Sequence, residues 1–170
     1  MKRTILAMAL AVAAMTGYAQ KFALIDMDYI LKNIPAYERA NEQLSQVSKK
    51  WQAEVEALTL EASTMYKNYQ NEVVFLPQEQ KKARQEAIMN KEKEASELKK
   101  KYFGPEGELF KKRESLMSPI QEEIYNAVAD IAELHGYSKV EDRAGNSYII
   151  YGSPKIDISN EVLDKLGYGH

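Results

Sequence analysis

The chain has no cysteine among its 170 residues and only 2 histidines, one of which is His170, the last residue. Without cysteine it cannot form a disulfide scaffold, a thiolate zinc site, an iron–sulfur cluster or a thiol nucleophile. With only two histidines, histidine-based catalysis and metal binding are also disfavoured. Glycine (8) and proline (5) are scarce, which favours long uninterrupted elements.

Motifs for enzymatic chemistry are missing as well. The chain has no Gly-rich phosphate loop with lysine and no Gly-x-Ser-x-Gly segment. Asp26 and Asp28 form an acidic pair, but they lie where a strand should end and a helix needs a cap, so Asp28 is interpreted as that cap rather than as a metal ligand. His135 precedes Gly136 and is interpreted as the end of a helix. We therefore expect no enzyme activity, no cofactor and no metal.

The first residues have the pattern of a secretory signal. Lys2 and Arg3 precede an apolar run over residues 5–15, and the small residues Gly17 and Ala19 follow. The run is too short to span a bilayer. We expect residues 1–19 to be removed after Ala19, and no cysteine follows that would carry a lipid anchor. The exported chain would have a net charge of −4, with +4 in residues 78–113 and −6 in residues 114–170.

From residue 37 onward, apolar residues follow one helical stripe with spacings of 3, 4, 3, 4 and 4. This average matches a straight α-helix, and some 40 residues would reach roughly 60 Å. The stripe consists of Tyr37, Ala40, Leu44, Val47, Trp51, Val55, Leu58, Ala62, Met65, Tyr69, Val73 and Leu76.

A second helix should run back along the first. Leu76-Pro77 ends the stripe, and residues 78–101 are rich in helix formers. If the chain turns near 75–78, the numbers of facing residues should sum to about 153, so that Trp51 meets Tyr102. Residues 104–107, Gly-Pro-Glu-Gly, should interrupt the return helix, either as a hinge or as a fixed kink. Ser118-Pro119 has the pattern of a new helix start. We expect residues 36–117 to form this helical arm.

Residues 20–35 and 118–170 should form a small β-rich body. Phe22–Ile25 is typical of a strand, residues 138–141 and 147–151 flank a turn and predict a β-hairpin, and Ser159 should cap a last helix. The predicted fold class is α+β, mostly helical. A body of 69 residues without disulfides is marginal alone, so we expect self-association. The residues expected in this oligomerisation body are Phe22, Leu24, Ile149, Tyr151, Val162, Leu163 and Leu166.

Both ends of the chain resemble a known family. The first end contains Phe22–Asp28, Ile30-Leu31 and Pro35. The second end contains Gly136-Tyr137, Val140, Asp157-Ile158-Ser159, Val162-Leu163 and Leu166. With the helical hairpin inserted between them, these segments resemble the Skp (OmpH-like) periplasmic chaperones. The resemblance implies a trimer whose three arms enclose a cavity. It also implies a periplasmic, ATP-independent holdase that keeps unfolded outer-membrane proteins soluble until they insert.

Side chains on the arms suit such weak and general binding. Aromatic residues and methionine offer adaptable apolar contacts, and several arms multiply weak ones. The candidate client-binding residues are Leu60, Met65, Tyr66, Tyr69, Phe75, Met89, Tyr102 and Phe103. Nucleic acid is not expected as a partner. Binding to lipopolysaccharide or to a membrane surface is disfavoured, because the exported chain is acidic whereas the best-known family members are basic.

The chief alternative is an exported structural or adaptor protein. Such a protein would dock to an envelope complex through its arm tips, with Phe75, Leu76 and Pro77 as the contacts. A chaperone should protect many unfolded proteins, whereas an adaptor should bind one partner.

Overall fold

The structure is a computed structural model that describes residues 21–145 and 148–169; the predicted signal, residues 1–19, lies outside these ranges. The chain divides into two compact units. We call residues Ile34–Glu122 the arm unit, and the described residues before and after them the body unit. None of the helices in the described ranges is long and apolar enough to cross a membrane.

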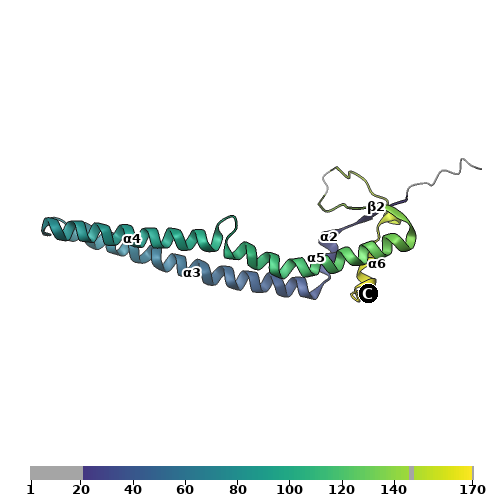
Figure 1. Ribbon diagram of the computed structural model, residues 1–170, viewed down its shortest axis with the longest axis horizontal. Helices are drawn as coiled ribbons and strands as arrows, with labels where there is room; N and C mark the ends of the chain where they lie inside the picture. Colours follow the sequence, from purple (N-terminus) through teal and green to yellow (C-terminus); the bar gives the residue numbers. More distant parts are fainter. Residues whose placement is uncertain (1–20, 146–147, 170) are drawn as a thin grey trace, which may run out of the picture. The chain divides into compact units, whose positions relative to one another are not determined.

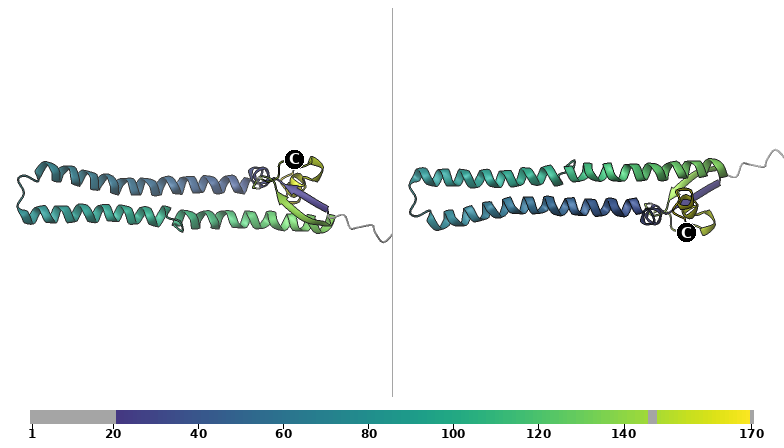
Figure 2. Two further views of the ribbon diagram at one scale, coloured as in Figure 1. Left: turned by 90° about the horizontal axis from the view of Figure 1, so that it is seen from above. Right: turned by 90° about the horizontal axis from the view of Figure 1, so that it is seen from below.

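Two long antiparallel helices make up most of the arm unit (Figure 1). Helix α3 (Pro35–Glu72) begins with proline at its first position, where no backbone donor is required. It ends four residues before the predicted end, and residues 73–77 form the turn into α4 (Gln78–Phe103). Helix α5 (Glu108–His135) follows, and its part within the arm unit continues in the direction of α4 along α3 (Figure 2). The predicted helical hairpin is therefore confirmed.

The predicted stripe is the face of α3 that is removed from solvent. Each of its members, from Tyr37 to Leu76, is buried or half-buried. The predicted register is also confirmed, because the rings of Trp51 and Tyr102 stack with centroids 4.6 Å apart. Glu61 and Lys91 form an ion pair across the same two helices, with 3.3 Å between Oε2 and Nζ.

The break between α4 and α5 is confirmed, but the predicted helix start at Ser118-Pro119 is wrong. Residues 104–107 interrupt the helical hydrogen bonding, and Gly107 N donates to Gly104 O at 2.9 Å. Helix α5, by contrast, runs through Pro119 without interruption. Proline inside a helix costs about 3 kcal/mol. The apolar face of α5, on which Ile120 and Ile124 are buried, outweighs that cost.

The body unit contains a small parallel sheet. Strand β1 (Lys21–Ile25) pairs with β2 (Tyr137–Asp142), and Leu24 forms a further parallel bridge to Asp157. Three short helical elements complete the body unit: α2 (Met27–Lys32), the 3-10 helix η1 (Pro154–Ile156) and α6 (Ser159–Lys165). The core residues are Ala23, Leu24, Ile25, Ile30, Ile124, Ala127, Ile131, Ile158, Val162 and Leu163.

The predicted β-hairpin of residues 138–141 and 147–151 is wrong. Residue 147 lies outside the described ranges, and residues 148–151 form no strand. The partner of β2 is β1, from the other end of the chain. The local sequence of a strand does not specify its partner, and the nearest apolar segment along the chain is not the partner here. The predicted helix end at His135 is confirmed, and Gly136 after it has a φ of 68°, a left-handed conformation that glycine adopts readily.

Two predicted helix caps are each wrong by one or two residues. The cap of α2 is Asp26, whose Oδ1 accepts a hydrogen bond from Tyr29 N at 2.9 Å, whereas Asp28 lies in the first turn. Helix α6 begins at Ser159 itself, and Asp157 Oδ1 accepts from Ser159 N at 2.9 Å. The Ser159 hydroxyl instead accepts from Asp26 N at 2.8 Å, which ties the two ends of the body unit together.

Candidate functional site

A groove runs along one face of the arm unit, between α3 and α4. Its floor is low because the residues there are short: Ala62 and Ala95 are buried where the helices meet, and Thr59, Ser63 and Ser96 flank them. Side chains of this size cannot fill the space that two neighbouring helices leave at their surface. The short side chains therefore leave a hollow between α3 and α4 near Ala62 and Ala95.

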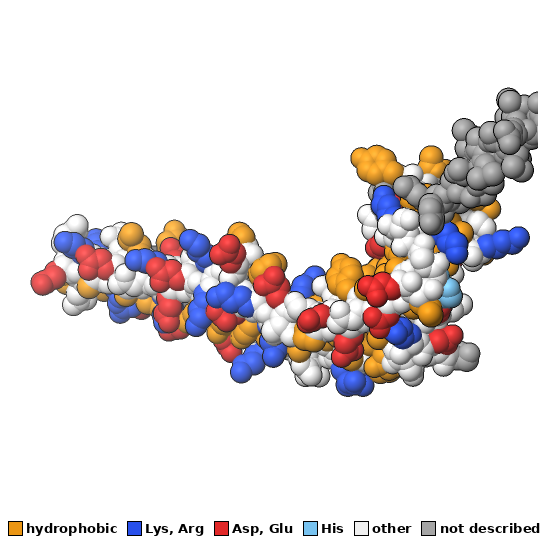
Figure 3. Space-filling model, turned by 45° about the vertical axis from the view of Figure 1, so that its right-hand side comes forward, with side chains coloured by type: hydrophobic (Ala, Val, Ile, Leu, Met, Phe, Trp, Pro, Cys, Tyr) orange, Lys and Arg blue, Asp and Glu red, His pale blue; other side chains and the backbone are white. Residues whose placement is uncertain are grey.

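Larger apolar side chains form the walls of the groove. Leu60 of α3 and Phe103 of α4 line one part of it, Tyr66 lines another, and Val55 is common to both. Leu60 is 68% exposed and Tyr66 49% exposed, so both present apolar surface to solvent. Figure 3 shows how apolar side chains lie in small groups between charged ones along the visible face of the arm.

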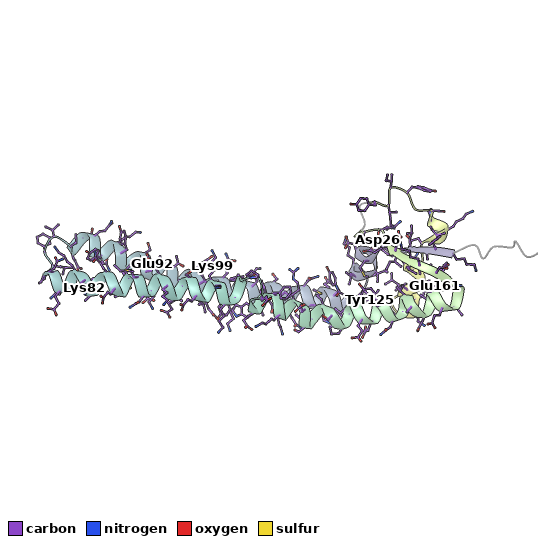
Figure 4. All side chains as sticks on the ribbon, turned by 45° about the horizontal axis from the view of Figure 1, so that its top comes forward. Asp26, Lys82, Glu92, Lys99, Tyr125 and Glu161 are labelled. Carbon is purple, nitrogen blue, oxygen red and sulfur yellow. The ribbon has the colours of Figure 1, made fainter. Side chains whose placement is uncertain are left out.

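Charged side chains stand around these apolar walls. Lys99 lines both parts of the groove, Glu56 one part and Glu92 the other; Glu92 and Lys99 are labelled on α4 in Figure 4. The neighbouring Lys91 is already paired, with Glu94 at 2.9 Å and Glu61 at 3.3 Å. Its hydrogen bonds, first to Glu94 and then to Glu61, raise the pKa of Lys91 above its ordinary value.

The structure brings together three of the eight predicted client-binding residues: Leu60, Tyr66 and Phe103 line the groove. Met89 is 66% exposed on α4, and Phe75 is 86% exposed in the turn. Neither is among the residues that line the groove.

The remaining three candidates, Met65, Tyr69 and Tyr102, are less exposed than the other five. Met65 and Tyr69 are half-buried, and the Tyr69 hydroxyl accepts from Gln85 Nε2 at 2.9 Å. Tyr102 is stacked on Trp51 and donates from its hydroxyl to Glu54 Oε2 at 2.6 Å. This geometry gives Tyr102 a role in joining α3 to α4.

The predicted oligomerisation residues separate into three groups by exposure. Leu24, Val162 and Leu163 are buried in the body unit's own core. Phe22 is 48% and Tyr151 82% exposed, while Ile149 and Leu166 are half-buried. The exposed members present the most surface to another molecule.

A polar network in the body unit was not predicted. Arg143 bridges two carboxylates, with Asp26 Oδ2 at 3.2 Å and Asp157 Oδ2 at 3.1 Å. Asp142 adds a second link, because its Oδ1 accepts from Met27 N at 3.0 Å. These acidic residues are therefore engaged by protein donors. Among the described residues no group of three or more histidine or acidic side chains is placed to hold a metal ion.

The groove-forming residues Thr59, Ser63, Ala95 and Ser96 were missed too. Their small size predicts a groove only once the two helices are placed side by side, because the hollow depends on short residues from both helices.

Comparison with known proteins identifies the family. A search of curated proteins found no match. A crystal structure of a proposed outer membrane chaperone (OmpH-like) from Caulobacter crescentus CB15 superimposes with a TM-score of 0.68 at 12% identity, covering 86% of this chain and 83% of that one. The fold is therefore shared. The family model described as outer membrane protein (OmpH-like) matches residues 21–166, and the chain belongs to the OmpH-like family.

Proposed function

We propose that this protein is an ATP-independent holdase chaperone of the periplasm. In this proposal it associates as a trimer and keeps unfolded outer-membrane proteins soluble, in a cavity between its arms, until they insert. The observation that carries the proposal is the exposed apolar surface along the arm of an OmpH-like chain, including the groove walls Leu60, Tyr66 and Phe103.

Weak and general binding follows from the chemistry of the arm. The exposed apolar side chains are separated by charged ones, so each contact area is small. Small apolar contacts bind weakly and with little sequence preference. Several arms around one client add avidity, and release needs no nucleotide if the folded membrane protein is the more stable state. The crystal structure to which the fold is similar is that of a proposed outer membrane chaperone, which supports the same role.

Self-association is supported by apolar surface on the body unit. Ile150 is 98% exposed and Tyr151 82% exposed, beside the half-buried Ile149. Exposed apolar residues in succession are unfavourable in an isolated chain and typical of an interface. Strand β2 also pairs with β1 alone among the described residues, which leaves one of its edges for a strand of another copy. The number three rests on the family resemblance.

An adaptor function is the second candidate, and one observation favours it. Val74 and Phe75, in the turn between α3 and α4, are 80% and 86% exposed. An apolar tip of this kind suits a pocket on a single partner. It would, however, leave the groove and the exposed residues along the arm without a role.

Aggregation of a β-barrel membrane protein tests the proposal. The client is unfolded in urea, diluted into buffer with the chaperone at near-stoichiometric ratio, and followed by light scattering. The exported chain should suppress scattering for several unrelated barrels, whereas an adaptor should suppress none.

A variant that lacks residues 49–104, the outer part of the arm, should lose this activity. Size-exclusion chromatography with light scattering first establishes that the shortened chain still associates. If the shortened chain still associated and still suppressed aggregation, the proposal that clients bind in a cavity between the arms would be contradicted. The single variant Leu60→Ser should change suppression little, because many weak contacts share the binding.

A further inference from the structure

The groove contains a lysine whose charge the arm does not neutralise. Lys99 is exposed and lines both parts of the groove. Within the described part of the chain it makes no ion pair, whereas Lys91 on the same helix is held by Glu61 and Glu94. Lys93, likewise on α4, is near Glu97. Lys99 is therefore a cation in the groove that can pair with a ligand.

Apolar walls lie beside this cation. Phe103 is one helical turn from Lys99 on α4, and Leu60 of α3 lines the same part of the groove. A lysine stem packs along apolar surface while its ammonium group remains in water. An apolar side chain seated between Leu60 and Phe103 would therefore bring its chain neighbours close to the Lys99 ammonium.

Acidic side chains limit the charge that the groove accepts. Glu56 lines the part of the groove walled by Leu60 and Phe103, and Glu92 lines the part walled by Tyr66. Each repels a carboxylate that lies near it. The lining therefore favours one negative charge close to Lys99 and disfavours a run of negative charges.

The length of the groove fits a polypeptide segment. Its lining residues on α3 extend from Gln52 to Tyr66, which corresponds to about 20 Å of helix. An extended chain rises about 3.3 Å per residue, so the groove spans about six residues of it. Such a segment can contact both apolar walls and the lysine between them.

The following inference rests on the proposed function. We propose that the groove binds segments of unfolded polypeptide in which one carboxylate lies between apolar side chains, and that Lys99 pairs with this carboxylate. Lys99 thus determines specificity within a site that otherwise binds apolar side chains generally. The occupant is an unfolded client segment rather than a second copy of this chain or a lipid surface.

Three labelled peptides of equal length test this assignment against the full exported chain. Their apolar residues are identical, and the central residue is aspartate, asparagine or lysine. Fluorescence anisotropy should show the aspartate peptide binding about threefold more tightly than the asparagine peptide at low salt, and the difference should fade as salt rises. Lys99→Gln should abolish that preference without weakening the binding of the asparagine peptide. Lys99→Arg, which keeps the positive charge, should retain the preference.

Lys82→Gln is the matched control, because Lys82 is an exposed lysine of the same helix that does not line the groove (Figure 4). It should leave the preference intact. Equal effects of Lys82→Gln and Lys99→Gln would overturn the assignment, because they would reflect overall charge. If Lys99→Gln weakened binding to phosphatidylglycerol vesicles but changed the binding of none of the peptides, the assignment would be overturned in favour of a membrane surface.

The proposed function and this inference fail in distinguishable ways. A chain that does not keep any unfolded barrel soluble contradicts the holdase function. A chain that does so, but binds the aspartate and asparagine peptides equally, contradicts only the role of Lys99.

Discussion

The rings of Trp51 and Tyr102 lie face to face, 4.6 Å between centroids and 5° from parallel, and join α3 to α4. The Tyr102 hydroxyl also donates to Glu54 Oε2 at 2.6 Å. Stacked aromatic pairs contribute about 0.5–1.5 kcal/mol beyond the area they bury. This contact combines apolar burial with a charged hydrogen bond, so we expect it to stabilise the register of the hairpin.

Trp51→Ala should lower the free energy of unfolding by about 2–3 kcal/mol, because it removes both the stack and the apolar contact with α4. Thermal unfolding followed by circular dichroism measures the change. Leu60→Ala is the control: its side chain is 68% exposed, so stability should change little. Equal losses in the two variants would show that the stack has no special role.

The hairpin should lose stability at alkaline pH. Hydrogen bonding to Glu54 is the largest cause that raises the pKa of Tyr102 above 10.0, and hydrogen bonds to Glu94 and then Glu61 raise the pKa of Lys91 above 10.5. In both cases the protonated form is favoured in the folded state. The resulting stability is fully present below the unfolded-state values and is lost as the pH rises through the raised ones.

Urea unfolding between pH 8 and pH 12 measures this loss. In Glu54→Gln the part due to Tyr102 should shrink, while the part due to Lys91 remains. A loss of identical size and midpoint in the wild type and Glu54→Gln would contradict the assignment to Tyr102.

Arg143→Ala should destabilise the body unit by about 1–2 kcal/mol, since it leaves Asp26 and Asp157 without their shared partner. Urea unfolding measures this effect, which should decrease at high salt. Lys139→Ala, which breaks the more exposed contact with Glu141, should cost less than about 0.5 kcal/mol. A larger cost for Lys139→Ala would contradict the bridging role of Arg143.

Gly107→Ala should disturb the break between α4 and α5. A Cβ at this residue would lie 2.7 Å from Tyr102 O and 2.9 Å from Lys101 O and Gly104 N, all of them backbone atoms. The expected cost is about 1–3 kcal/mol in thermal unfolding. Glu106→Ala, an exposed change within the same turn, should be nearly neutral. A neutral Gly107→Ala would indicate a turn loose enough to rearrange.

Ile150→Asp should weaken self-association, because it places a charge on an apolar residue that is 98% exposed in the single chain. Sedimentation should show a dissociation constant at least about tenfold higher than that of the wild type. Val74→Asp makes the same change at a residue that is 80% exposed in the arm and should leave association unaffected. The reverse outcome would place the interface on the arm.

The arm was predictable because its information is local and repeated. A stripe with helical spacing identifies the face of α3 that is buried, and a single turn then determines which residues meet. The partnership of Trp51 with Tyr102 follows from those two features. Pro119 shows the limit of such reasoning, since its local preference for a helix start was overruled by the packing of the apolar face around it.

The body was less predictable because its contacts join distant segments. The sequence indicated a strand at residues 138–141, but only packing decided that its partner is β1 and not residues 148–151. The Asp26–Arg143–Asp157 network depends on the same pairing, since it brings the two ends of the chain together. The groove on the arm likewise appears only when the short residues of two helices are placed side by side.

The sequence by itself determined that this protein has a long helical hairpin, which apolar faces are buried, and that chemistry based on cysteine is absent. Spacing along one chain is sufficient for these conclusions because helices are built from contacts between near neighbours. The tertiary structure alone decided the parallel pairing of β1 with β2, the continuity of α5 through Pro119 and the hollow beside Lys99. Those features depend on contacts between segments far apart in the sequence, and their energies are not encoded in any local pattern.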